Sequence, residues 1–354
     1  MIAVAIVSAA ATAFAQDPAP ETPAVVTANP WFLRVSYSPA RVLAATRFQS
    51  GEDSARPMTL EIGRQTDGTR LWHRIYNYPS YGVGLYIGSF NHRQEFGQPL
   101  AAYAFFSWPF PVSSRTQVTA DFGGGASWRW REYDPKTNPT NTALGSDKAY
   151  HVDAGVYLRY IASARSNVYA GLNLTHWSNG GTQEPNLGLA TVGPKIGVRY
   201  NFSPQVAPSR AARGPLPPFI RTSEFVVGAA GGRKNAGDRD FRTSNITAGL
   251  QRHFYRFGKV GAGADITYDG SAPKLTALGL YGGYEHVIAR FSILAQLGSI
   301  VGSGFGNDDI PRFYQRVGAR VYLTVPVWAM FAVRSVNFKE ATSLEFGFGY
   351  RARW

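Results

Sequence analysis

The sequence predicts an all-β protein, specifically a transmembrane antiparallel up-and-down β-barrel of about 14 to 16 strands. Three observations support this prediction. The 354-residue chain is rich in glycine (38 residues) and in aromatic residues (14%), and only 17% of it is charged. Segments of about ten residues alternate apolar and polar side chains with a period of two, as strands do. Beyond the N-terminus, no stretch reaches the eighteen or so consecutive apolar residues that a membrane helix requires.

The N-terminus has the pattern of an export signal. Residues 1–15 are apolar and end in Ala13-Phe14-Ala15, a small-x-small cleavage pattern, so this segment is expected to be a signal peptide. Residues 16–30 are rich in proline and alanine and are expected to be disordered. An exported β-barrel of this kind belongs in a bacterial outer membrane.

Charge and residue usage narrow the set of partners. The chain has no cysteine, which excludes disulfides, and six scattered histidines show no metal-ligand spacing, so neither a metal nor a cofactor is expected. The net charge of +13 comes from arginines spread along the strands rather than clustered in a nucleic-acid motif. Phosphorylated lipid is therefore a better expected partner than nucleic acid.

Three later segments alternate most regularly. Residues 260–268, 313–323 and 342–354 place apolar side chains on one face and glycine or polar side chains on the other, and the last segment ends in Trp354. Such alternation is typical of a barrel with an apolar outside and a polar interior. The inward positions are expected to hold an ion-pair network made of Asp121, Asp153, Arg159, Arg199, Asp265, Glu285, Arg316 and Arg320.

Connection lengths predict which end of the barrel is which. If the last strand runs toward the periplasm, short turns at 255–256, 287–288 and 325–326 lie on the periplasmic side. The longer polar connections at 233–240, 269–274 and 301–311 then lie outside, as is usual for such barrels.

A Pro- and Arg-rich connection at 204–221 divides the strands into 31–203 and 222–354. The two parts form either one barrel or two. One barrel is expected, with 222–354 closing it, because each part alone would need its own closure and only the second ends in a terminal aromatic strand.

A histidine and a serine lie two residues apart at the end of the segment 168–178. His176 and Ser178 continue the row of Val168 and Leu172 on the outward face, near the external rim. One interpretation is a histidine tolerated at the level of the lipid headgroups. The other is a reactive pair, since residues two apart on a strand are about 7 Å apart and on the same side, so that His176 can act as a general base for Ser178.

The run "HWSNGGTQEPNLG" followed by "GPKIGVRYNF" resembles the lipid A 3-O-deacylase (PagL) family, also called acyloxyacyl hydrolases. The stretches "WHRIYNYPSYGVGL", "YDPKTNPTNTALGS" and "EFGFGYRARW" are similar to its larger bacterial members. The resemblance implies an outer-membrane serine esterase that removes an ester-linked acyl chain from lipid A, in lipopolysaccharide, without a metal. The alternative is a non-catalytic or porin-like barrel that keeps the family fold.

The same resemblance assigns roles within the run. It implies His176 as base and Ser178 as nucleophile, Asn179 with Gly180 and Gly181 for oxyanion stabilisation, and Asn186 as a residue that shapes the site. The founding members carry a glutamate fourteen residues after the histidine, where this chain has Ala190. Glu184 is the candidate substitute for the orienting acid, and Asp147 is a poorer one.

Overall fold

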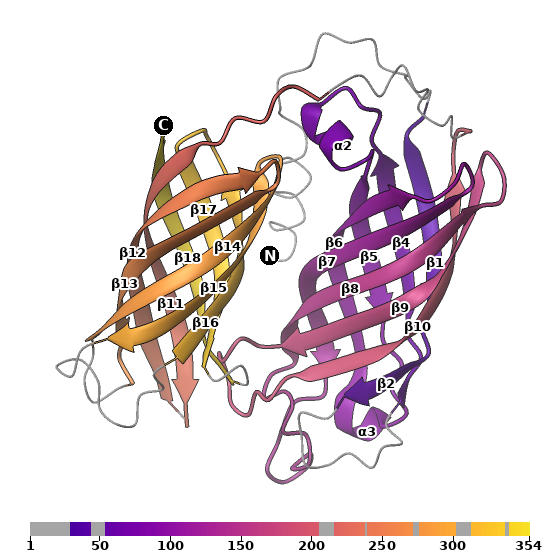
Figure 1. The fold of residues 1–354 in the computed structure, drawn as a ribbon. Helices are drawn as coiled ribbons and strands as arrows, with labels where there is room; N and C mark the ends of the chain where they lie inside the picture. The colour runs from indigo at the N-terminus through magenta and orange to yellow at the C-terminus, as the bar shows by residue number, and fades with distance from the viewer. Residues whose placement is uncertain are drawn as a thin grey trace. The chain divides into compact units, whose positions relative to one another are not determined.

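A computed structural model describes residues 29–43, 54–204, 216–237, 239–271, 276–301, 313–336 and 340–354 (Figure 1). The expected signal peptide and almost all of the 16–30 segment lie outside the described residues, as does the middle of the Pro- and Arg-rich connection. Among the described residues there is no helix whose length and hydropathy would allow it to cross a membrane.

Eight antiparallel strands close into a first barrel. Closure comes from the pairing of the first strand with the last, in which Phe32 is opposite Asn201 and Tyr37 is opposite Ile196. The strands in spatial order are β1 (Trp31–Tyr37), β4 (Met58–Gln65), β5 (Ser80–Ile87), β6 (Gly97–Pro111), β7 (Thr116–Trp130), β8 (Lys148–Ile161), β9 (Ser166–Ser178) and β10 (Leu189–Asn201).

Four short elements flank this barrel. The strand β2 (Ala40–Leu43) adds to the end of β10, and β3 (Ser54–Ala55) pairs with β2. The helix α2 (Leu71–Ile75) follows β4, and the helix α3 (Arg93–Phe96) follows β5, so they lie at opposite ends of the barrel (Figure 1). Because β5, β7 and β9 run in the same direction, their outgoing connections all lie at the α3 end.

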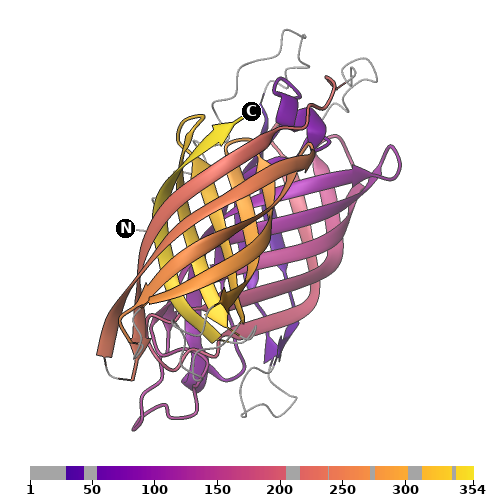
Figure 2. The same cartoon turned by 60° about the vertical axis from the view of Figure 1, so that its left-hand side comes forward.

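A second closed barrel follows. Its eight strands pair in sequence order, and β11 pairs with β18 to complete the ring (Figure 2). They are β11 (Ser223–Ala236), β12 (Arg239–Tyr255), β13 (Gly258–Asp269), β14 (Thr276–Ile288), β15 (Phe291–Val301), β16 (Phe313–Tyr322), β17 (Val327–Val336) and β18 (Glu340–Arg353).

The expectation of a single barrel closed by 222–354 is therefore wrong. The sixteen barrel strands form two rings of eight, and the chain divides into two compact units. Each part does have its own closure: the N-terminal strand β1 closes the first ring, and β10 leads into Tyr200 and Phe202, an aromatic end comparable to the one that β18 provides.

The predicted alternation is confirmed in both barrels. In β9, β13 and β16 the apolar row faces outward, with Leu172 66% exposed, while the opposite row is buried or half-buried. The eight residues expected inside the barrel are all buried: Asp121, Asp153, Arg159, Arg199, Asp265, Glu285, Arg316 and Arg320.

The turns predicted near 255–256, 287–288 and 325–326 connect β12 to β13, β14 to β15 and β16 to β17. The connection predicted at 233–240 is shorter than expected, because β11 extends to Ala236 and β12 begins at Arg239. Residues 302–311 and 272–274, which belong to the other two predicted connections, lie outside the described residues.

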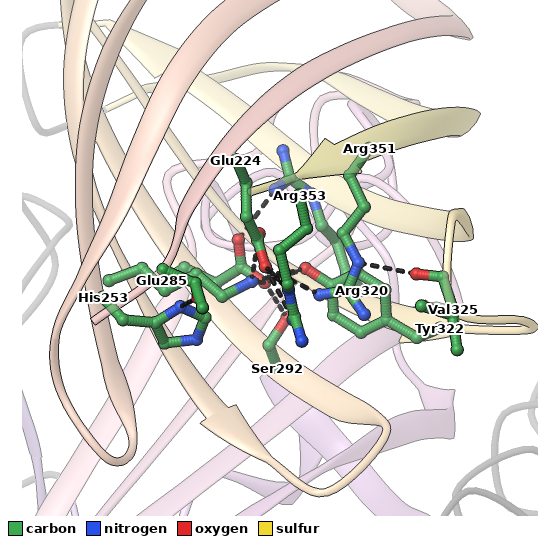
Figure 3. A network of polar contacts seen from close by, with 11 residues as sticks. Glu224, His253, Glu285, Ser292, Arg320, Tyr322, Val325, Arg351 and Arg353 are labelled. Atoms are coloured by element: carbon green, nitrogen blue, oxygen red, sulfur yellow. Dashed lines mark hydrogen bonds and ion pairs between the residues drawn. The ribbon is translucent and has the colours of Figure 1, made fainter. Parts of the chain in front are cut away.

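Buried ion pairs fill both interiors. In the first barrel Arg34 bonds Glu61 and, at 2.6 Å, Asp121, while Lys195 pairs with Asp153 at 3.5 Å. In the second, the fully buried Lys259 donates to Glu224 at 2.9 Å and belongs to a network that also contains Glu285, Ser292, Arg320, Tyr322, Arg351 and Arg353 (Figure 3). Charges buried together in this way must be paired, which ties several strands of each ring to one another.

Candidate active site

The last three residues of β9 form the centre of the site. His176 is exposed on the outer face, Trp177 is completely buried and points inward, and Ser178 is half-buried on the same face as His176. Because side chains alternate along a strand, the imidazole and the hydroxyl emerge on one side, about 7 Å apart at their Cα atoms. Below them on this face lie Leu174 and Leu172, both exposed.

Trp177 fixes this end of the strand from the inside. Its ring packs against Tyr86, Phe90 and Trp130, with centroid distances of 5.4, 5.9 and 5.3 Å. These rings belong to one buried cluster at the α3 end of the first barrel, which also includes Leu144 and Leu189. A tryptophan held by several aromatic partners has little freedom, so its neighbours in sequence are held in place as well.

The neighbours of His176 across the ladder are apolar. His176 is opposite Val152 on β8 and opposite Ala190 on β10, and Leu43 of β2 lies beyond Ala190. The position where the founding family members carry a glutamate is thus in direct register with the imidazole, and here it holds a methyl group. Ser178 is opposite Tyr150, which shares its outward face.

Gly188 packs directly against the imidazole. Its φ of +76° is in the left-handed region, and a Cβ built there would lie 2.9 Å from His176 Cε1. Its backbone N–H donates to the carbonyl of Ala143 at 3.0 Å, which ties it to the β7–β8 connection. Only glycine fits both the conformation and the contact, so this position restricts the space available to the ring.

The predicted oxyanion residues lie where β9 ends. Asn179 is 2% exposed, and Gly180 and Gly181 have φ values of +74° and +79°. Asn179 belongs to the compact unit of the first barrel, whereas Gly180–Leu187, which includes Glu184 and Asn186, belongs to the unit of the second. Asn186 is half-buried.

Within that second unit, Glu184 makes two hydrogen bonds. Its backbone N–H donates to Asn235 Oδ1 at 3.2 Å, and its carboxylate accepts from the backbone N–H of Gly237 at 3.2 Å. The side chain is exposed. Its predicted role as orienting acid stays a prediction.

Asp147 lies at the end of the β7–β8 connection. Its carboxylate is 57% exposed and is 3.8 Å from Lys148 Nζ. An exposed pair of this kind contributes little stability. In the part of the chain that is described, no group of three or more His, Cys, Asp or Glu side chains is placed to hold a metal ion.

Gly188 and Tyr150 were not among the predicted site residues. Gly188 ends the Pro-Asn-Leu-Gly stretch, so the sequence did offer a signal for it. Its contact with His176, however, depends on how the connection between β9 and β10 folds back toward the strand. Tyr150 becomes a neighbour of Ser178 only through the β8–β9 register.

Fold and site together define a class: paired antiparallel β-barrels, one of which carries a histidine and a serine on its outer face at the end of a strand. Residues 58–201 match the model of the lipid A 3-O-deacylase (PagL) family, and residues 223–354 match the acyloxyacyl hydrolase C-terminal domain. The chain belongs to the PagL family. The second match begins at the first residue of β11, so this family domain corresponds to the second barrel.

No curated protein matches the chain. Among solved structures, a porin mutant of Rh. blastica is 10% identical, with 91% of this chain and 99% of that one covered and a TM-score of 0.20. Omp33 of Acinetobacter baumannii is 8% identical, with coverages of 92% and 98% and a TM-score of 0.18.

Proposed function

We propose that the first barrel is an outer-membrane serine esterase that removes an ester-linked acyl chain from lipid A. Family membership supports deacylation in general. The observation that carries the finer proposal is the end of β9, where His176 and Ser178 share an outward face that continues into exposed leucines. In an outer membrane that face would contact acyl chains, so a lipid substrate reaches the pair without entering the barrel.

The chemistry follows from the two side chains. His176 removes the proton from the Ser178 hydroxyl as its Oγ attacks the ester carbonyl carbon. The negative charge on the carbonyl oxygen needs hydrogen-bond donors, and the Asn179 side chain and the backbone N–H groups of Gly180 and Gly181 are the candidates. Collapse of the intermediate releases the sugar hydroxyl, which takes the proton from His176, and water then hydrolyses the acyl-serine by the same path.

Mass spectrometry of lipid A from cells that express the protein tests this function. Wild type is expected to produce lipid A that lacks one acyl chain, and Ser178→Ala and His176→Ala are expected to leave it intact. Unchanged lipid A in cells that display the folded wild-type protein in the outer membrane would remove the proposal.

The second candidate is a barrel that keeps the family fold without catalysis, either structural or porin-like. The missing carboxylate at Ala190 favours it, since a histidine without an acid is less well held. The buried ion pairs in both interiors argue against its porin-like form. Stable single-channel conductance together with unchanged lipid A would establish it.

A further inference from the structure

A polar cavity opens at the α3 end of the first barrel, and the proposed chemistry does not use it. Its volume is about 570 Å³, and it lies between α3 and the β7–β8 connection. Its lining includes His92, Arg93, Glu95, Arg131, Thr137 and Thr140. It includes part of the "YDPKTNPTN" stretch that the sequence shares with larger family members.

Two buried amides hold the walls of this cavity together. Asn138 Nδ2 donates to the carbonyls of Glu95 at 3.0 Å and Glu132 at 2.9 Å. Asn141 Nδ2 donates to the carbonyls of Arg131 at 2.6 Å and Glu95 at 3.2 Å. Both amides are nearly inaccessible, at 4% and 1% exposure, so they join α3 to the β7–β8 connection rather than serve a ligand.

Packing inside the barrel also holds α3 and the β7–β8 connection together. Phe96, at the end of α3, is buried in the aromatic cluster that contains Trp177, and its carbonyl accepts from the N–H of Arg131 at 3.2 Å. Ala143 and Leu144 of the β7–β8 connection are buried in the same cluster. The cavity is therefore preformed, and the connection that lines it continues to Ala143, which binds Gly188 beside His176.

The described residues that line the cavity carry mainly positive charge. Arg93 and Arg131 are exposed and line it. Arg131 donates to the carbonyl of Thr137 at 3.2 Å. When the Gln98 amide is oriented to satisfy its hydrogen bonds, the Gln98 side-chain oxygen accepts from the Arg93 guanidinium. A guanidinium has five N–H donors, so each arginine keeps donors for a ligand. Among the described residues that line the cavity, Glu95 is the one carboxylate, and it lies 3.6 Å from His92.

We infer that this cavity binds the phosphorylated sugar head of a lipid, with Arg93 and Arg131 on the phosphate. A guanidinium matches phosphate oxygens in geometry and charge. The hydroxyls of Thr137 and Thr140 and the amides of Asn91 and Gln94 suit sugar hydroxyls. The inference rests on the proposed function, because it names the part of the same substrate that remains at the barrel rim while an acyl chain lies against the outer face.

Binding is measured with the full-length Ser178→Ala protein in detergent micelles, so that no turnover is needed. The probes are lipid A that carries both phosphates, the same lipid with its phosphates removed, and inorganic phosphate. The double variant Arg93→Ala/Arg131→Ala is compared with Arg115→Ala, an exposed arginine at the opposite end of the barrel. The lysine double variant Arg93→Lys/Arg131→Lys provides a second, milder change, and heat-modifiable gel mobility confirms that each barrel is folded.

The double alanine variant is expected to bind phosphorylated lipid A about tenfold or more weakly, while its affinity for the dephosphorylated lipid and the affinity of Arg115→Ala stay unchanged. The lysine variant is expected to lie between the two. Equal losses on both lipids, or no loss on either, would overturn the inference. Inorganic phosphate binding as tightly as the lipid would also overturn it, because the site would then recognise free phosphate.

The two proposals fail separately. Arginine-dependent binding to a wild-type protein that hydrolyses nothing would leave the headgroup site standing without the esterase. Normal hydrolysis together with binding that does not depend on the two arginines would support the esterase and overturn the headgroup site.

Discussion

Ala190 lies directly opposite His176 in the β9–β10 ladder, with its methyl group on the same outward face as the imidazole. Directly opposed side chains have Cβ atoms about 5 Å apart, which is within reach of a hydrogen bond from a longer side chain. The register therefore gives a physical reason why the family's founding members carry a glutamate here. It also means that the effect of replacing Ala190 by a glutamate on hydrolysis can be measured.

Ala190→Glu is expected to raise kcat by about tenfold or more, because a carboxylate at this position can orient the imidazole and stabilise the imidazolium that forms during attack. Hydrolysis of purified lipid A in micelles measures it. Ala190→Gln, which has the same length but no charge, is the control and is expected to give little gain. Equal rates for the two variants would mean that the charge opposite His176 is irrelevant.

Glu184→Gln tests the other source of the acid. If Glu184 orients His176, the change lowers kcat by about tenfold or more, and adding Ala190→Glu restores it. An unchanged rate in Glu184→Gln would leave the Ser178–His176 pair to act without this acid.

Gly188→Ala is expected to lower both stability and activity. A methyl group at a φ of +76° costs about 1 kcal/mol of stability, and here it would also displace the His176 ring, so kcat is expected to fall about tenfold. Gly237→Ala is the matched control, because its φ is +62° but its Cβ would meet nothing within 4 Å. Thermal unfolding and kcat are measured for both. A fall in kcat as large for Gly237→Ala would show that strain alone, and not the contact with His176, is responsible.

Trp177→Ala is expected to destabilise the first barrel by about 3 to 5 kcal/mol and to abolish hydrolysis, because it removes the ring that holds the end of β9. Trp328→Ala in the second barrel removes a tryptophan that is 1% exposed and is expected to cost similar stability. The Trp328→Ala variant is expected to keep hydrolysing lipid A at temperatures below its unfolding temperature. Equal loss of hydrolysis in the two variants would contradict a specific role for Trp177.

The connection between β4 and β5 is expected to lose stability in mild acid. Its His73 is 6% exposed, and its Nδ1 lies 3.1 Å from Asp67 Oδ1. Burial lowers the pKa of His73, although Asp67 acts in the opposite direction, and the hydrogen bond with His73 lowers the pKa of Asp67. The unfolded histidine, with a pKa of about 6.5, takes up a proton first, so the stability that neutral His73 provides is present above that pH and is lost as the pH falls below it.

Hydrogen exchange at pH 7.5 and 5.5 measures this loss. Amides of residues 66–79 are expected to exchange faster at pH 5.5, after correction for the intrinsic rate, and the His73→Gln variant is expected to lose that difference. The β7–β8 connection serves as the internal reference. Protection that does not change with pH would contradict the buried, neutral imidazole.

Much of the fold followed from side-chain alternation, because a period of two decides which face each residue takes. The outward row of β9 and the inward positions of Arg316 and Asp265 were predicted in this way. Ring closure was not, because it depends on pairing between strands far apart in sequence, such as Phe32 with Asn201. The short strand β1 and the aromatic end of β10 are the sequence signals for a separate first barrel. Periodicity alone, however, does not show that β1 and β10 pair with each other.

For the candidate site, side-chain alternation predicts that His176 and Ser178 share one face of β9, where His176 is exposed and Ser178 is half-buried. The contact of Gly188 with the imidazole and the cavity beside α3 arise from connections that fold back over the rim, and local pattern carries no information about such contacts. Spacing along the chain does not predict the roles of Glu184 and Asn186 for the same reason, because both residues lie in such a connection.

Hydrolysis of purified lipid A by the full-length protein, followed by mass spectrometry of both products, tests the role of Ser178 directly when Ser178→Ala and Ser178→Cys are compared with wild type. If Ser178 is the nucleophile, wild type is expected to release one free fatty acid per lipid A, Ser178→Ala none, and Ser178→Cys is expected to carry a trapped or slowly released acyl adduct. Hydrolysis by Ser178→Ala at the wild-type rate would contradict this role.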